Sequence, residues 1–66
     1  MNGLKSKRIA AGLSQTELAE IIGTVQSAVS AWESGAKMPR ASQLPALAEA
    51  LHCTIDELYA GDKNSA

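Results

Sequence analysis

The sequence predicts an all-α domain of five short helices, and three observations support this fold class. Apolar residues recur at helical spacing in five segments, each flanked by residues that start or stop helices. Glycines follow the first three segments, at Gly12, Gly23 and Gly35, where a left-handed backbone ends a helix at little cost. With one Trp, one Tyr and no Phe, the core must consist mainly of aliphatic side chains, which suits close helix packing.

The first two helices have the clearest boundaries. We expect the first over residues 4–11. The second begins after Ser14, because Ser14 and Glu17 form a capping box in which each side chain accepts from the other residue's backbone N–H. Gly23 ends it. Its apolar face carries Leu18, Ala19 and Ile22.

The third helix is expected from Val25 to about Ser34, with Thr24 as its N-cap. Its inward face carries Val25, Ala28, Val29 and Trp32. Since Trp32 shares this spacing, we interpret it as a core residue and not as a stacking platform for bases.

The last two helices follow a loop that contains Pro39. Ser42 is expected to cap the fourth helix, whose first turn tolerates Pro45 and whose apolar stripe is Leu44, Leu47, Ala48 and Leu51. Thr54 and Glu57 repeat the capping box for a fifth helix that ends at Gly61, with Ile55 and Leu58 inward. The 66 residues suffice for one domain, expected over residues 1–61, with a disordered polar tail over 62–66.

The stretch from Gln15 to Glu33 has the spacing of two helices that cross over a short turn. Ala19 allows the backbones to approach there, and Gly23 supplies the positive φ of the turn. The second helix of the pair leaves small or polar side chains exposed near its start: Gln26, Ser27, Ser30 and Ala31. Such groups can read base edges in a major groove, and Ala31 can touch a thymine methyl group.

Basic residues gather in the amino-terminal part of the chain. Residues 1–40 carry a net charge of +2 and residues 41–66 a net charge of −3, so a near-neutral chain can still present a positive face. The backbone N–H of Gln15, at a helix start, can bind a phosphate. Four side chains flank the same face and could neutralise phosphates: Lys5, Lys7, Lys37 and Arg40.

Three segments together resemble the Cro and repressor-type helix-turn-helix family of lambdoid phage repressors: LKSKRIAAGLSQTELAEIIGT, VSAWESG and LPALAEALHCTIDELYAG. The resemblance covers residues 4–61 and implies a lambda-repressor-like fold whose third helix enters the major groove. Gln15, Gln26 and Ser27 match the main base- or phosphate-contacting positions, and Thr24 and Ser30 match secondary ones. It also implies a structural ion pair between Arg8 and Glu33.

The resemblance further implies a homodimer on an inverted-repeat operator, acting as a transcriptional repressor of phage or bacterial mobile-element type. Leu58 and Tyr59 lie where the family often dimerises, although Tyr59 could equally pack over the edge of the core. The sequence departs from the family at Ile21, Ala31 and Met38, positions that are often polar or basic. These changes predict fewer phosphate contacts per monomer.

Other functions find less support in the sequence. A protein-interaction module on the same fold, antitoxin-like or a co-regulator, is the alternative, because the carboxy-terminal part is acidic and Ile21 is expected to be exposed. No paired acids, metal cluster or phosphate loop indicates an enzyme, so we expect no enzymatic activity, cofactor, metal or small-molecule ligand. With one cysteine and no long apolar run, we expect no disulfide, no membrane segment and a cytoplasmic location.

Overall fold

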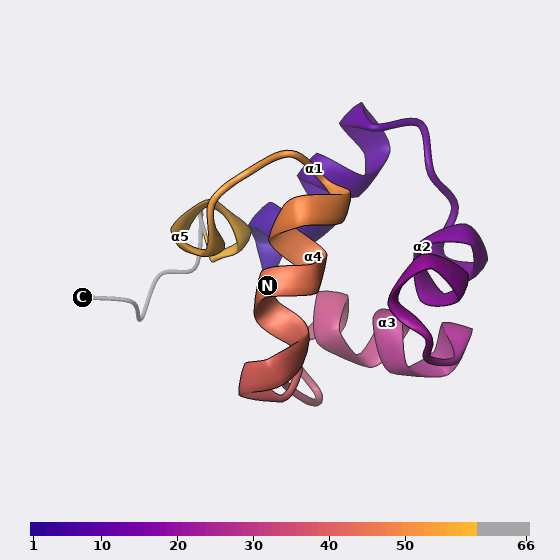
Figure 1. The fold of residues 1–66 in the computed structure, drawn as a ribbon. Coiled ribbons are helices and arrows are strands. Elements are labelled where there is room, and N and C mark those ends of the chain that lie inside the picture. Colours follow the sequence, from indigo (N-terminus) through magenta and orange to yellow (C-terminus); the bar gives the residue numbers. More distant parts are fainter. Residues whose placement is uncertain (60–66) are drawn as a thin grey trace.

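The computed structural model describes residues 1–59, which form five α-helices and one short 3-10 helix and contain no strand (Figure 1). Their bounds are α1 Asn2–Ala10, α2 Gln15–Ile22, α3 Gln26–Ser34, η1 Ala41–Gln43, α4 Leu44–Ala50 and α5 Ile55–Leu58. The predicted all-α class and helix order are therefore confirmed. The predicted helix end at Gly61 and the predicted tail over 62–66 lie outside the described residues.

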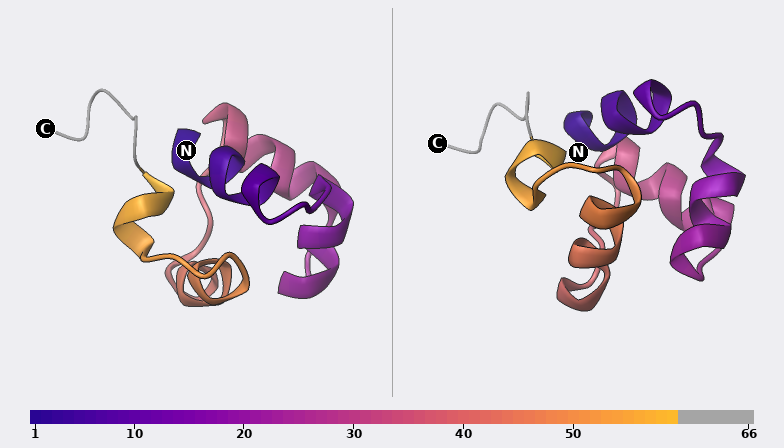
Figure 2. Two further views of the ribbon diagram at one scale, coloured as in Figure 1. Left: turned by 90° about the horizontal axis from the view of Figure 1, so that it is seen from above. Right: turned by 45° about the horizontal axis from the view of Figure 1, so that its top comes forward.

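The helices are arranged around one core. Helices α2 and α3 lie side by side at one end of the molecule, and α4 and α5 occupy the other side (Figure 2). Helix α1 packs against both α3 and α5, while α4 packs against α2 and α5. These contacts fix the α2–α3 pair to the rest of the molecule through two separate helices.

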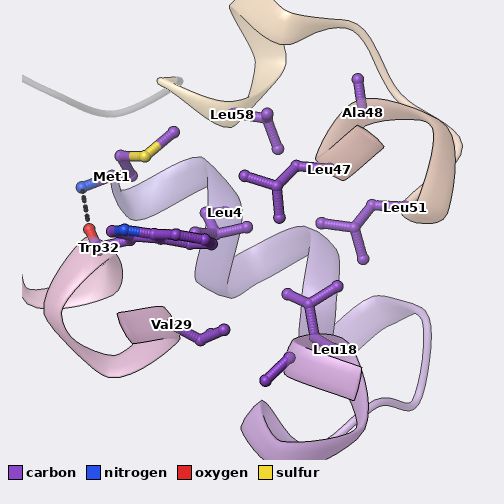
Figure 3. Packing of buried hydrophobic residues seen from close by; sticks show 10 residues of the cluster. Met1, Leu4, Leu18, Val29, Trp32, Leu47, Ala48, Leu51 and Leu58 are labelled. Carbon is purple, nitrogen blue, oxygen red and sulfur yellow. Dashed lines mark hydrogen bonds between the residues drawn. The ribbon is translucent and has the colours of Figure 1, made fainter. Parts of the chain in front are cut away.

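The core is aliphatic around a single indole, as the composition predicts. Trp32 is 4% exposed, which confirms it as a core residue, and Figure 3 shows it beside Leu4, with Met1 on one side and Val29 on the other. The α-ammonium group of Met1 donates a hydrogen bond to the carbonyl oxygen of Trp32 at 3.3 Å. The buried hydrophobic residues are Met1, Leu4, Leu18, Ala19, Val29, Trp32, Leu47, Ala48, Leu51 and Leu58.

Both predicted capping boxes are present. The Ser14 hydroxyl accepts from the Glu17 N–H at 3.0 Å, and the Glu17 carboxylate accepts from the Ser14 N–H at 2.8 Å. Thr54 and Glu57 make the same reciprocal pair at 3.2 and 2.8 Å. Each box satisfies two backbone donors that the first turn of a helix leaves unpaired.

Two other predicted caps are wrong. Helix α3 starts one residue later than expected, and its N-cap is Val25 without a side-chain hydrogen bond, so Thr24 does not cap it. Ser42 lies inside η1, and the Gln43 side chain instead accepts from the Arg40 N–H at 2.8 Å. The 3-10 turn before α4 displaces the expected cap because the chain already bends at Arg40.

Two predicted inward residues face solvent. Val25 is 63% exposed and Ile55 is 37% exposed. Both occupy the start of a helix, where Val25 is the extended N-cap of α3 and Ile55 opens the short α5. For Val25 the cause is its backbone: an N-cap residue does not follow helical geometry, so helical spacing does not predict which way its side chain points.

Candidate nucleic-acid interface

The turn between α2 and α3 is built on two small residues. Gly23 is in the left-handed region, with φ 86°, which glycine adopts without a side-chain clash. The N–H groups of Gly23 and Thr24 both donate to the carbonyl oxygen of Ala19, at 2.9 and 2.8 Å. Ala19 itself is 2% exposed. This turn fixes how α3 leaves α2, as the spacing predicts.

Helix α3 has one anchored face and one open face. Val29 and Trp32 are buried and hold the helix against the core. On the other side, Gln26 and Ser27 are exposed in its first turn, while Ser30 is half-buried. The side chains that could reach a ligand are therefore concentrated near the amino terminus of a helix that is anchored to the core.

A chain of hydrogen bonds connects this open face to the interior. Gln26 Nε2 donates to Gln15 Oε1 at 2.6 Å, and Gln15 Nε2 donates to Glu33 Oε1 at 3.0 Å. Arg8 then holds Glu33 with two donors, Nε to Oε2 at 2.6 Å and Nη2 to Oε1 at 3.2 Å. The Arg8–Glu33 ion pair that the resemblance implies is thus present, and it links α1 to the end of α3.

The ion pair is nearly closed to solvent. The side chains of Arg8 and Glu33 are 12% and 5% exposed, and Arg8 Nη1 also donates to the carbonyl oxygen of Leu13 at 2.8 Å. Burial alone would raise the pKa of the Glu33 carboxyl, but hydrogen bonds from Arg8 and Gln15 and the charges of Arg8 and Lys5 together lower it. Glu33 therefore stays ionised at neutral pH.

A groove of about 600 Å³ opens beside the start of α3. Thr24 and Ser27 line it from the α2–α3 pair, and Lys37 and Arg40 line it from the segment that leads to α4. The structure thus brings together two predicted polar contacts and two predicted phosphate-binding cations around one hollow. Gln15, Gln26 and Ser30 are not part of its lining.

The remaining two predicted cations lie elsewhere. Lys7 Nζ is 3.2 Å from Glu57 Oε2, so its charge is directed toward α5. Lys5 is exposed on α1, and its charge acts on the Glu33 carboxyl. Of the four predicted flanking cations, Lys37 and Arg40 are those that share the groove with α3.

The fold and this arrangement agree with a known family. A helix-turn-helix family model, HTH_3, matches residues 4–58. The chain belongs to this helix-turn-helix family. It is the Cro and repressor-type family of DNA-binding domains from transcription regulators that the sequence resembles.

A curated relative is similar over nearly the whole helix-turn-helix domain. It is the HTH-type transcriptional activator BcrR of Enterococcus faecalis, 35% identical over 60 residues. The alignment covers 91% of this chain and 29% of the relative. The chain therefore spans less than a third of the length of this relative.

The predicted dimer surface needs one correction. Leu58 is fully buried in the core, so it is not available for a partner. The short α5 turns this side chain toward α1 and α4, against which it packs. Tyr59 is half-buried and packs at the edge of the same core, so of these two residues only Tyr59 retains exposed surface.

Two polar residues of the groove are not among the contacts that the sequence predicts. Ser42 and Gln43 line it together with Lys37 and Arg40, whereas the sequence assigned Ser42 to a helix cap. The available signal was Gln43 three residues after Arg40, the spacing at which a side chain accepts from an earlier backbone N–H. That spacing predicts a tight turn beginning at Arg40.

Residues 1–59 contain no group of three or more His, Cys, Asp or Glu side chains placed to hold a metal ion. Within the same part of the chain, no helix combines the length and the apolar character needed to cross a bilayer.

Proposed function

We propose that this domain binds a specific double-stranded DNA site as a homodimer on an inverted repeat, with α3 in the major groove. Gln26 carries the proposal, because it is exposed in the first turn of α3 and held by Gln15 at 2.6 Å. Glutamine pairs with adenine through its amide N–H and oxygen, a contact that distinguishes bases. Ser27 stands beside it as a second base contact, with Thr24 and Ser30 in support.

The groove supports the proposed placement of the DNA backbone. A phosphate there would meet the cations of Lys37 and Arg40 and the hydroxyl of Thr24, all of which line the groove. Phosphate contacts fix register and orientation, and base contacts give specificity. In this proposal, phosphate contacts from Lys37 and Arg40 position α3 in the major groove so that Gln26 reaches a base edge.

Selection from a pool of random duplexes tests this proposal. We expect enrichment of an inverted repeat with half-sites about one helical turn apart, and loss of base preference at one position of each half-site for Gln26→Ala. Ala46→Ser, on the exposed side of α4, is the control and should select the same sequence as the unchanged protein. A folded protein that enriches no sequence at low salt would contradict the proposal.

We further propose that binding represses transcription. Repression requires only that the bound protein occupy a promoter, whereas activation also requires a productive contact with the transcription machinery. The relative from Enterococcus faecalis is named an activator, so the choice between repression and activation of transcription needs its own experiment. A reporter whose promoter overlaps the selected site should lose expression when the protein is supplied; a gain would reject repression and leave DNA binding intact.

One observation favours the alternative of a protein-interaction module. Ile21 is 57% exposed and lines a groove of about 470 Å³ between α2 and α4. If no duplex is enriched, this surface becomes the better candidate for the functional site. A partner captured by the protein should then remain bound when the cations Lys5, Lys7, Lys37 and Arg40 are neutralised together.

A further inference from the structure

The hydrogen-bond chain behind α3 begins at a group that can only accept. An ionised carboxylate has no hydrogen to donate, and the Glu33 carboxylate is held in place by two donors from Arg8. At 5% exposure of its side chain, water has little access to it. Any side chain that bonds to Glu33 must therefore present a donor.

This requirement orients the amide of Gln15. Its Nε2 faces Glu33 Oε1 at 3.0 Å, so its Oε1 faces the opposite way, toward α3. Gln26 meets that oxygen with its own Nε2 at 2.6 Å. The two amides are therefore aligned in one direction, and the carboxylate fixes that direction.

The alignment determines what Gln26 still offers to a ligand. A glutamine amide has two N–H donors and one oxygen acceptor. One donor of Gln26 is used on Gln15, which leaves one donor and the acceptor. Adenine presents the complementary pair in the major groove, the N7 acceptor and the N6 amino donor, whereas guanine presents two acceptors, N7 and O6.

We infer that Glu33 is a positioning residue for base recognition: acting through Gln15, it makes Gln26 select adenine over guanine. The inference rests on the proposed function. Without the carboxylate, Gln15 can turn its amide over and donate to Gln26 Oε1. Gln26 would then direct both N–H groups outward, a pattern that suits guanine.

The charges around Glu33 keep it an acceptor. Its pKa is lowered because the hydrogen bonds from Arg8 and Gln15 and the positive charges of Arg8 and Lys5 outweigh the effect of burial. The groups that face it come from α1 and α2, the helices that carry these three side chains. The amide alignment therefore persists throughout the neutral range.

The test compares binding to duplexes that differ only at the base pair read by Gln26, identified by the position at which Gln26→Ala loses preference. For Glu33→Gln, whose introduced amide can both donate and accept, the ratio of guanine to adenine dissociation constants should fall roughly 3- to 10-fold. Arg8→Lys is the control, since it weakens the ion pair but leaves an acceptor-only carboxylate. It should retain the ratio of the unchanged protein, although its stability falls too.

Gln15→Met provides a second variant that keeps the Arg8–Glu33 pair and removes the link, in case Glu33→Gln does not fold. Its adenine preference should fall as well. A ratio unchanged in Gln15→Met or in folded Glu33→Gln would overturn the inference, and so would an equal loss of preference in Arg8→Lys.

A measurement without DNA separates this inference from the proposed function. In the free protein, nuclear Overhauser effects should connect the Gln15 Nε2 protons to the Glu33 side chain and the Gln26 Nε2 protons to Gln15. Contacts of the reversed amide orientation would overturn the inference even if specific DNA binding is found. Failure to enrich any duplex would instead reject the proposed function.

Discussion

At the residue scale, one glycine controls how closely two helices approach. Gly3 lies in α1, and a Cβ built on it would overlap the carbonyl oxygen of Glu57 and come within 2.8 Å of the Leu58 carbonyl carbon. Both atoms belong to the backbone of α5, which cannot move aside as a flexible side chain could. The sequence gives no local sign of this contact, because it joins residues more than fifty positions apart.

Gly3→Ala should therefore destabilise the protein, by about 1–3 kcal/mol, the usual cost of overpacking a close contact. Urea unfolding followed by circular dichroism measures the change in free energy of unfolding. The control is Ser6→Ala, exposed on the same helix, which should change stability by less than about 0.5 kcal/mol. Equal stability of Gly3→Ala and the unchanged protein would contradict the tight α1–α5 contact.

The Arg8–Glu33 pair supports a second prediction at this scale, which concerns the stability of the protein at acid pH. The pKa of Glu33 lies below its ordinary value, despite the opposing effect of burial, because of Arg8, Gln15 and Lys5. A carboxyl with a lower pKa in the folded state binds protons more readily when unfolded. Its contribution to stability is therefore complete above the unfolded pKa, about 4.3 for Glu, and is lost as the pH falls through the folded pKa.

Stability should accordingly be steady near neutral pH and decline below about pH 5. Glu33→Gln should lower stability at pH 7 by about 3 kcal/mol, since Arg8 loses its buried partner, and should flatten the decline in acid. Denaturant unfolding at a series of pH values measures both effects. Glu20→Gln, at an exposed position on α2, should leave the decline unchanged; a variant at Glu33 with the same slope as the unchanged protein would disagree with this account.

At the element scale, the helix starts differ in how they are satisfied. Helices α2 and α5 have reciprocal side-chain boxes, whereas α3 starts at Val25 without a side-chain cap. An uncapped helix start leaves backbone N–H groups available to a ligand. In the proposed complex, the open start of α3 faces the DNA, so the missing cap lies where backbone donors are useful.

Two serine substitutions compare the observed Ser14 cap of α2 with the Ser42 cap that the sequence predicts for α4. Ser14→Ala removes the hydroxyl that accepts from Glu17 at 3.0 Å and should cost about 1 kcal/mol. Ser42→Ala should cost less than about 0.5 kcal/mol, because the turn at η1 is closed by Gln43 and Arg40 instead. Thermal and urea unfolding of the two variants provide the comparison, and a larger cost for Ser42→Ala would restore the cap predicted from sequence.

The features that the sequence predicts correctly depend on residues that are close together in the chain. The Ser14–Glu17 and Thr54–Glu57 boxes join residues three apart, and Gly23 ends α2 through its own backbone conformation. The inward positions of Val29 and Trp32 also follow from helical spacing. The same spacing wrongly predicts Val25 and Ile55 as inward residues, because they lie at helix starts, where neighbouring elements decide exposure.

The candidate site likewise has features that local spacing predicts and contacts that it does not. The exposed pair Gln26 and Ser27 follows from the face of α3 that the core leaves free. By contrast, the contacts from Gln15 to Gln26 and Glu33 join separate helices, and no periodicity reports them. The position of Lys7 in the sequence predicts a phosphate-binding cation, whereas the fold places its ammonium group beside the Glu57 carboxylate.

At the scale of the whole molecule, the charge distribution limits what attraction to DNA can contribute. The chain has a net charge of −1, so long-range attraction to phosphate is weak and the proposed affinity depends on local contacts. Two cations, Lys37 and Arg40, line the groove next to α3. Lys7 offsets an acidic side chain of α5 at 3.2 Å, and solvent screens an exposed pair of this kind.

Because Arg40 lines the groove and Lys7 pairs with Glu57, removing each charge should have a different effect on the salt dependence of DNA binding. Arg40→Gln and Lys7→Gln each remove one positive charge per chain, so they change the net charge equally. If Arg40 neutralises one phosphate in each half-site, its loss should reduce the slope of log K against log salt by about 0.9 per chain, or about 1.8 for the dimer. Lys7→Gln should leave the slope unchanged, because the Lys7 ammonium group is engaged by Glu57.

Titrations of the selected duplex between about 50 and 200 mM salt measure the slopes. Equal reductions for both variants would mean that net charge, and not the groove beside α3, governs the electrostatic contact; a change of about 0.9 for Arg40→Gln would instead indicate one chain per site.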